Sequence, residues 1–211
     1  MTRSDSAKYG LALHTTSPQL GLAFSNFNND RRIQVWDLGR ELSSHLHSYL
    51  AEFMQPQTWQ DVAFIAVAKG PGGFTGTRIG MVTARTLAQQ LDLPIFPIST
   101  LAAVAEAEKT AYAGQYLAVQ MNARRDELFV AIYTVSEDGL RLTEILPDTT
   151  LKPEKWQETL EDLKTDYSLI HAPSLLGCTV SGVLNLACND WKQGKLSHWS
   201  QALPFYGQHP V

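Results

Sequence analysis

The stretch KGPGGFTGTRIG, residues 69–80, carries five glycines, two threonines and one arginine. It follows the apolar run DVAFIAVA at residues 61–68, which is typical of a strand covered on both faces of its sheet. Residues 74–91 then show helical periodicity, which ends where Asp92 and Pro94 interrupt it. The stretch is therefore predicted to be the turn that joins a buried strand to a helix in an α/β fold.

The residues before this turn predict three strands and a helix. The segments YGLALHTTS (9–17), LGLAFSN (20–26) and RRIQVWDLG (31–39) favour a three-stranded antiparallel meander. An amphipathic helix is expected from Glu41 to Met54, because large apolar residues recur there at steps of three and four. These residues are Leu42, Leu46, Tyr49, Leu50 and Phe53.

After the turn, PIFPIS (94–99) predicts another strand, and TLAAVAEAEKTA (100–111) predicts a helix capped by Ser99 or Thr100. The pattern then restarts after Gly114. Further elements are expected as strands at 115–123, 126–135 and 141–148 and as helices near 154–164 and 180–193. We therefore predict a first domain over residues 1–110, with the glycine-rich turn, and a smaller, shortened domain of the same type over 111–211.

Composition and charge restrict the class of protein. Of 211 residues, 44% are hydrophobic and 18% charged, which is ordinary for a globular protein. A formal net charge of −4 argues against a chain that binds nucleic acid by itself. Two cysteines are too few for a disulfide framework, and no apolar run approaches the roughly 20 residues of a membrane span. We expect a cytoplasmic location, with no leader peptide and no membrane contact.

The glycine-rich turn matches neither common phosphate-binding motif. A Walker A loop requires a lysine after its last glycine, and no register of residues 69–80 supplies one. A dinucleotide fingerprint beginning at Gly70 requires a third glycine where Thr75 stands. The helix N-terminus would still suit an anion, but tight turning and close packing are the commoner reasons for such glycines.

Gly76 and Gly80 lie inside the predicted helix, where each costs roughly 1 kcal/mol relative to alanine. With Ala84 and Ala88 they form a stripe of small residues that allows another helix to approach closely. The apolar arc of this helix, which includes Ile79 and Met81, spans roughly 200°, about twice what one sheet requires. We expect the stripe to face another chain; the alternative is that it packs inside this chain.

The residues around the turn resemble a known family. The segment at 70–105, GPGGFTGTRIGMVTARTLAQQLDLPIFPISTLAAVA, resembles the signature of the bacterial tRNA threonylcarbamoyladenosine biosynthesis family TsaB, also called YeaZ and formerly grouped with glycoproteases. LGRELSSHLHSYL at 38–50 is similar to the family's first helix. MNARRDELFVAIY at 121–133 is similar to its D-A-R-R-x-E-V-Y strand, and LPFYGQ at 203–208 to its closing motif.

This resemblance implies a fold and a role. The fold is the actin-like, Hsp70-like ATPase fold with a ribonuclease H-like core, a mixed sheet of three antiparallel strands followed by βαβ units. The role is that of a non-catalytic partner without cofactor or metal. It implies binding to the catalytic paralogue TsaD and the ATPase TsaE, and contact with ANN-decoding tRNA through that complex. The adenosine next to the anticodon is the base that is modified.

The resemblance also implies which residues contact TsaD, since the family's first two helices form that interface. The candidate interface residues here are Leu42, His45, Leu46, Tyr49, Phe74, Thr75, Gly76, Ile79, Gly80, Met81, Ala84 and Ala88. An exposed apolar face on these helices further predicts a homodimer when TsaD is absent. For His45 alone, the plainer interpretation is an exposed polar residue.

One position departs from the family pattern. The family's first strand usually ends in I-D-T-S, whereas His14 precedes Thr15 and Thr16 here. A remnant of the fold's phosphate site is expected at His14, Thr15, Thr16, Gly72 and Gly73. Because the aspartate and a loop lysine are both missing, we expect nucleotide to bind weakly or not at all.

Other residue patterns favour no catalytic or metal site. His45 and His47 are two apart on a helix, so their side chains diverge. Cys178 and Cys188 are expected to be idle thiols. Arg124 and Arg125 would suit a phosphate or carboxylate, but solvation or pairing with the following acidic residues is the commoner outcome.

Two other functions remain as alternatives at this point. A stand-alone ATPase or kinase of the actin-like fold is indicated only by the glycine-rich turns and by HTTS at residues 14–17. A peptidase is indicated only by the family's former grouping. No H-E-x-x-H pair supports a zinc peptidase.

Overall fold

The computed structural model describes residues 8–208. Its first sheet has the strand order β3-β2-β1-β4-β5, in which β2 runs antiparallel to β1 and β3 and the other neighbours are parallel. The predicted antiparallel meander is confirmed. The five strands are β1 (Tyr9–His14), β2 (Gln19–Ser25), β3 (Arg31–Asp37), β4 (Val62–Ala68) and β5 (Ile95–Ile98).

The second sheet has the order β8-β7-β6-β9, with β7 antiparallel to both β6 and β8 and with β9 parallel to β6. Its strands are β6 (Tyr116–Asn122), β7 (Leu128–Val135), β8 (Leu142–Leu151) and β9 (Tyr167–His171). Strand β9 is absent from the sequence prediction, because five residues are too few to show a clear period.

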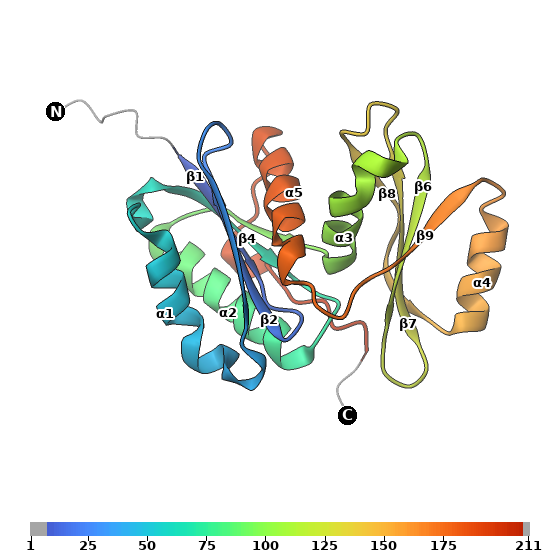
Figure 1. The fold of residues 1–211 in the computed structure, drawn as a ribbon, viewed down its shortest axis with the longest axis horizontal. Coiled ribbons are helices and arrows are strands. Elements are labelled where there is room, and N and C mark those ends of the chain that lie inside the picture. Colours follow the sequence, from blue (N-terminus) through green and yellow to red (C-terminus); the bar gives the residue numbers. More distant parts are fainter. Residues whose placement is uncertain (1–7, 209–211) are drawn as a thin grey trace.

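In the described part of the chain, five α-helices pack on these sheets: α1 (Leu42–Met54), α2 (Phe74–Leu91), α3 (Thr100–Glu108), α4 (Pro153–Asp162) and α5 (Val180–Lys192). Helices α1 and α2 lie on one face of the first sheet, and α5 lies on the other (Figure 1). Helix α3 covers the inner face of the second sheet and contacts α5, while α4 covers its outer face. Every predicted helix is present to within a few residues.

The alternation of side chains along β1 explains this layering. Leu11 and Leu13 are fully buried beneath α1 and α2, while Ala12 points to the opposite face and packs with α5. Strand β4 is buried on both faces, as its continuous apolar run predicts.

The strand order and directions of the first sheet are those of a ribonuclease H-like core, so the predicted fold class is confirmed. Within residues 8–208 the second sheet repeats the first four positions of that order and has no fifth strand. The division of the chain at residue 110 stays a prediction. Helix α5 belongs to the later half of the sequence but packs on the first sheet.

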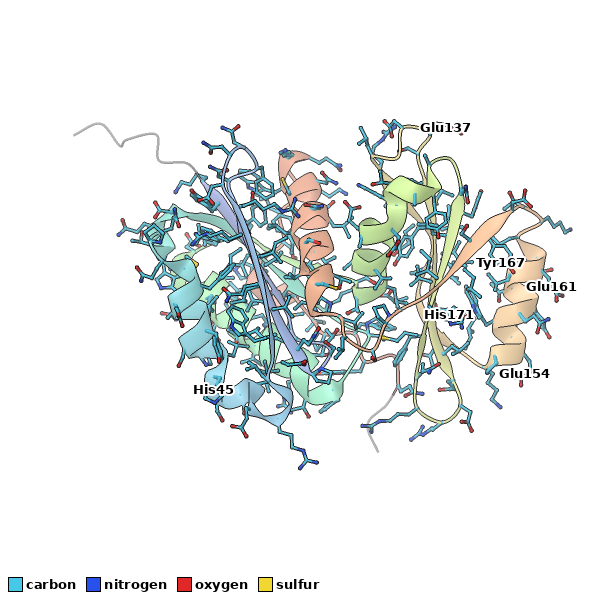
Figure 2. All side chains as sticks on the ribbon, viewed as in Figure 1. His45, Glu137, Glu154, Glu161, Tyr167 and His171 are labelled. Atoms are coloured by element: carbon cyan, nitrogen blue, oxygen red, sulfur yellow. The ribbon has the colours of Figure 1, made fainter. Side chains whose placement is uncertain are left out.

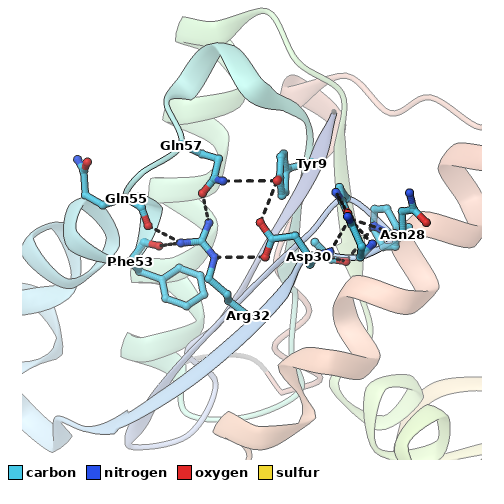
Figure 3. Close-up of polar contacts among 11 residues, drawn as sticks. Tyr9, Asn28, Asp30, Arg32, Phe53, Gln55 and Gln57 are labelled. Atoms are coloured by element: carbon cyan, nitrogen blue, oxygen red, sulfur yellow. Dashed lines mark hydrogen bonds and ion pairs between the residues drawn. The ribbon is translucent and has the colours of Figure 1, made fainter. Parts of the chain in front are cut away.

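A polar network fixes the outer strand of the first sheet to the end of α1 (Figure 3). The Arg32 guanidinium donates to the carbonyl oxygen of Phe53 at 3.1 Å, and also bonds Gln55 O and Gln57 Oε1. On its other side Arg32 lies 3.9 Å from the Asp30 carboxylate, which accepts a hydrogen bond from the Tyr9 hydroxyl. These contacts hold β3 and α1 in a fixed relation.

Candidate functional site

A cleft of about 1270 Å³ lies between the two halves of the chain. One wall comes from the β1–β2 turn, the start of α1 and the glycine-rich turn before α2. The other comes from the β6–β7 hairpin, the segment after β9 and the C-terminal residues. Its residues include Thr15, Thr16, Arg40, Gly72, Gly73, Phe74, Arg124, Arg125, Tyr206 and Gln208.

Four of the five residues predicted as a phosphate-site remnant line this cleft, namely Thr15, Thr16, Gly72 and Gly73. The Gly73 amide donates to Thr16 O at 2.7 Å, so the glycine-rich turn is bonded to the β1–β2 turn. A Cβ on Gly72 would lie 2.4 Å from the same carbonyl oxygen, which leaves no space for a side chain. Close backbone packing therefore accounts for Gly72, whereas a Cβ on Gly73 would lie an ordinary 3.5 Å from the same oxygen.

His14, the fifth of these residues, does not line the cleft. Its side chain is fully buried at the end of β1, and neither ring nitrogen has a hydrogen-bond partner within residues 8–208. Burial lowers the pKa of the imidazole to about 3, because the charged form cannot be solvated there. His14 is thus a neutral residue of the interior at pH 7.

Contacts with Thr15 explain why positions 76 and 80 inside α2 are occupied by glycine. A Cβ on Gly80 would lie 2.1 Å from Thr15 Oγ1, and a Cβ on Gly76 would lie 2.1 Å from Thr15 O. The Thr15 hydroxyl donates to Gly76 O at 2.8 Å. The small-residue stripe therefore packs against the end of β1 within this chain, and the expectation that it faces another chain is wrong.

Burial separates the twelve predicted interface residues into two groups. Six are buried in the core of this chain, so the prediction that they contact a partner is corrected: Leu42, Leu46, Gly80, Met81, Ala84 and Ala88. The other six remain at least partly accessible: His45, Tyr49, Phe74, Thr75, Gly76 and Ile79. Only the second group can contact another molecule without disruption of the core.

The wide apolar arc of α2 has a second partner in the same chain. The C-terminal turn Trp199–Gln201 packs on α2, and the fully buried Ala202 joins the same core cluster. The Arg85 guanidinium lies 6.0 Å from the centre of the Trp199 ring. The surplus apolar surface is thus partly covered by residues more than 100 positions away in sequence.

The cleft is positively charged. Arg40, Arg124 and Arg125 line it, and none of the three forms an ion pair within residues 8–208. Over the same residues, no aspartate or glutamate lines it. Arg124 and Arg125 are solvent-exposed, which agrees with the plainer of the two interpretations of this pair.

The C-terminal segment bridges the two walls of the cleft, which the sequence did not predict. Phe205 N donates to Lys69 O at 2.7 Å, and the Tyr206 ring lies 4.6 Å from that of Phe74. On the opposite wall, Gln208 Nε2 donates to Arg124 O at 2.8 Å. The motif LPFYGQ therefore joins the start of α2 to the β6–β7 hairpin.

A second polar cluster lies where β5 leads into α3. The Ser99 hydroxyl donates to Asp148 Oδ1 at 2.6 Å and accepts from Ala102 N at 3.1 Å, which confirms Ser99 as the N-cap of α3. Burial raises the pKa of the Asp148 carboxyl to about 6, although Ser99 and the Lys69 charge oppose this. The second carboxylate oxygen of Asp148 and the Tyr133 hydroxyl are buried without partners among the described residues.

Neither cysteines nor histidines form a site in the described part of the chain. Within residues 8–208 no cluster of three or more His, Cys, Asp or Glu residues is arranged to hold a metal ion. Cys178 is exposed, and burial raises the pKa of the Cys188 thiol. His45 is exposed and lies 3.9 Å from Glu41. Over the same range, no helix is both long enough and apolar enough to span a membrane.

Fold and cleft together define a two-lobed α/β protein with a ribonuclease H-like first half. The model of the family described as TsaD, tRNA N6-adenosine threonylcarbamoyltransferase, matches residues 39–193. This chain therefore belongs to that family, and the relatives it resembles are TsaB proteins. The resemblance predicted from residues 70–105 is thus confirmed.

The relatives are similar over part of their length. TsaB of Bacillus subtilis is 38% identical over 103 residues, which cover 49% of this chain and 43% of that protein. TsaB of Buchnera aphidicola from Acyrthosiphon pisum is 28% identical over 149 residues, 70% of this chain and 66% of that one. This chain thus spans between about two fifths and two thirds of the length of these relatives.

The fold extends over nearly the whole chain. The crystal structure of a Pseudomonas aeruginosa protein, described as similar to the peptidase YeaZ, superposes with a TM-score of 0.78 at 22% identity. The superposition covers 95% of this chain and all of the other. The later half of the sequence therefore keeps the fold of that protein even where its sequence motifs are sparse.

Proposed function

We propose that this chain is the non-catalytic partner of TsaD in the biosynthesis of threonylcarbamoyladenosine in tRNA. The adenosine next to the anticodon of ANN-decoding tRNAs is the substrate of the complex, and TsaE is its third member. The names of the TsaB relatives and of the family support this assignment. The complex works in the cytoplasm, and this chain brings neither a cofactor nor a membrane contact.

One observation carries the proposed interface: the outer surface of α2 has apolar side chains that stay exposed within residues 8–208, although the Tyr206 ring packs beside Phe74. Phe74 is 39% exposed and Val82 is 54% exposed, both on α2. Helix α1 lies beside α2 on the same face of the sheet (Figure 1). We assign this surface to TsaD, with Val82 added to the six accessible residues His45, Tyr49, Phe74, Thr75, Gly76 and Ile79.

The cleft residues support a non-catalytic role. An ATPase or kinase of this fold binds its nucleotide with magnesium, which requires oxygen ligands such as carboxylates. Within residues 8–208 no carboxylate lines the cleft, and His14 stands buried at the position of the family aspartate. The stand-alone ATPase or kinase is therefore the weaker alternative.

The proposal is tested by binding to TsaD from the same organism. We expect the pair to co-purify, and the substitution Val82→Lys to weaken the complex at least tenfold, because a charge would be buried at the interface. Leu196→Lys is the matched control, since Leu196 is 73% exposed and lies outside α1 and α2. Depletion of the chain tests the pathway. We expect the modified nucleoside to be lost from tRNA, as measured by mass spectrometry.

Two results would overturn the proposal. Equal affinity of TsaD for wild type, Val82→Lys and Leu196→Lys would remove α1 and α2 from the interface. ATP turnover by the purified chain alone, abolished by a substitution in the cleft, would favour the stand-alone enzyme.

A further inference from the structure

The cleft between the two halves carries arginines on both of its walls. Arg40 lies on the first wall, just before α1, and Arg124 and Arg125 lie on the opposite wall, in the turn between β6 and β7. All three are solvent-exposed, and none forms an ion pair within residues 8–208. A negatively charged ligand is therefore the kind that this cleft favours.

Several acidic residues of the chain lie far from this cleft. Figure 2 shows Glu154 and Glu161 on α4, which covers the outer face of the second sheet, and Glu137 at the other end of that sheet. Strand β7 starts from the β6–β7 turn, so its whole length separates Glu137 from the arginines of that turn. A formal net charge of −4 is thus compatible with a local site of positive charge.

The two carboxylates that follow Arg125 in sequence do not neutralise the cleft. Asp126 is not among the residues that line it. Glu127 accepts a hydrogen bond from Gln208 Nε2 at 2.5 Å, so its carboxylate is engaged by the C-terminal segment. Neither of them forms an ion pair with an arginine in the described part of the chain. The charge of the arginines is therefore available to a ligand.

The backbone that carries Arg124 is fixed, while its side chain is free. Arg124 N donates to Gln208 Oε1 at 3.3 Å, and Gln208 Nε2 donates to Arg124 O at 2.8 Å. The Thr150 hydroxyl donates to Gly207 O at 2.9 Å, which bonds the same C-terminal segment to β8. A ligand therefore meets arginines on a turn that is already held in place, and binding costs side-chain freedom alone.

An aromatic side chain lies in the same cleft. The Tyr206 ring packs 4.6 Å from the Phe74 ring at an angle of 37°, and both residues line the cleft. Tyr206 is only partly buried, so it remains accessible to a ligand. Basic side chains for backbone phosphates beside an aromatic ring for bases are the combination by which proteins hold single-stranded nucleic acid.

We propose that this cleft binds a single-stranded stretch of RNA. Arg40, Arg124 and Arg125 contact its phosphodiester groups, and no metal ion is needed, because guanidinium groups bind phosphate oxygens directly. The Tyr206 ring stacks on one base, and Phe74 is left to the proposed TsaD surface. The inference rests on the proposed function, which makes tRNA the RNA concerned. Unpaired loops, such as the one that holds the anticodon, have bases that are free to stack on a protein.

An RNA strand fits the cleft better than a free phosphate or an acidic peptide. The volume of about 1270 Å³ exceeds the roughly 300–1,000 Å³ of ordinary small-molecule pockets. Arginines on two walls suit several phosphates in series, as a nucleic acid backbone presents them. An acidic peptide would use the arginines, but it has no flat base for the Tyr206 ring.

The test measures RNA binding by the chain alone, so that it does not depend on TsaD. Fluorescence anisotropy follows a labelled single strand of about 12 nucleotides, and a duplex of the same length, at low salt. We expect the single strand to bind at least tenfold more tightly, because the bases of a duplex are not free to stack. Its affinity should fall with salt at a log–log slope of about −2, since three phosphates contribute roughly −0.7 each.

Substitutions separate the charge contacts from the stacking contact. Arg124→Gln combined with Arg125→Gln should lower the affinity at least tenfold and reduce the salt slope to about −0.7. Arg141→Gln is the matched control, because Arg141 is exposed, forms no ion pair within residues 8–208 and lies beyond the far end of β7. Tyr206→Ala should weaken binding at least fivefold at an unchanged salt slope, and Tyr206→Phe should retain the wild-type affinity.

Several results would overturn the proposal. Equal binding of single strand and duplex, an equal loss in Arg141→Gln, or no saturable binding by the wild type would each exclude the cleft as an RNA site. Micromolar binding of inorganic pyrophosphate that Tyr206→Ala leaves unchanged would mean a site for a free phosphate. An acidic peptide of the same net charge that binds as tightly as the RNA would mean a protein ligand. All these measurements omit TsaD, whose binding Val82→Lys tests separately.

Discussion

At the scale of single residues, Gly80 shows how tertiary contacts reverse the effect on stability that helix propensity alone predicts. Propensity alone predicts that Gly80→Ala would stabilise α2 by roughly 1 kcal/mol. The new Cβ would lie 2.1 Å from Thr15 Oγ1 and 3.2 Å from Thr15 Cβ. We therefore expect Gly80→Ala to lower the free energy of unfolding by about 1–3 kcal/mol, measured by guanidinium denaturation.

A double-mutant cycle isolates the cause. Thr15→Ala removes the hydroxyl that Gly80→Ala would contact, so the cost of the alanine should fall well below its value in the wild-type chain. An increase in stability on Gly80→Ala in the wild-type background, or an equal cost in both backgrounds, would contradict the packing inferred for this stripe.

The buried His14 and the partly buried Asp148 are expected to affect the pH dependence of stability in opposite directions. Burial lowers the pKa of His14 to about 3, so its neutral form stabilises the fold above pH 6.5 and that stability is lost as the pH falls. Burial raises the pKa of Asp148 to about 6, so the folded state binds its proton more tightly than the unfolded state. The contribution of Asp148 is present below pH 4 and is lost as the pH rises to 6.

The two effects nearly cancel between pH 4 and 6, and single substitutions separate them. Relative to wild type, we expect the stability of Asp148→Asn to rise with pH across this range by about 1.4 kcal/mol per unit. For His14→Leu the difference from wild type should fall with pH by a similar amount. Denaturation at half-unit steps of pH measures both, and parallel curves for all three proteins would refute the assignment.

At the scale of elements, α2 packs against three parts of this chain: the first sheet, α1 and the C-terminal turn at Trp199–Gln201. Its wide apolar arc predicted a second packing surface, but not which segment would supply it. That segment is more than 100 residues away, and no local pattern connects the two.

Shortening the Trp199 side chain in the C-terminal turn tests this packing. We expect Trp199→Ala to lower the free energy of unfolding by about 1–3 kcal/mol, because a half-buried indole that packs on α2 and Arg85 would be lost. Leu196→Ala, three residues away and 73% exposed, should change stability by less than about 0.5 kcal/mol. A similar cost for both would show that the turn does not stabilise α2.

At the scale of the whole molecule, the cleft combines three unpaired arginines with the absence of any acidic lining residue in the part of the chain described. We expect ATP affinity in the absence of TsaD to be weaker than about 100 μM and insensitive to added magnesium, because no carboxylate is available there to hold the ion. Calorimetry with and without magnesium checks this. Micromolar binding that requires magnesium would contradict it.

Local patterns were sufficient to predict the order of most strands and helices. The continuous apolar run of β4, the meander of β1 to β3 and the cap at Ser99 each depend on neighbours in sequence, and each is present. The glycine-rich turn was recognised from its composition, and the family from its motifs.

Tertiary contacts alone decided what those glycines and small residues face. Periodicity places Gly76, Gly80, Ala84 and Ala88 on one stripe of α2, but it does not distinguish a strand of the same chain from a helix of another. The approach of Thr15, more than 60 residues earlier, made that choice. The burial of His14, the partial burial of Asp148 and the contact of Tyr206 with Phe74 at the cleft likewise depend on segments that only folding brings together.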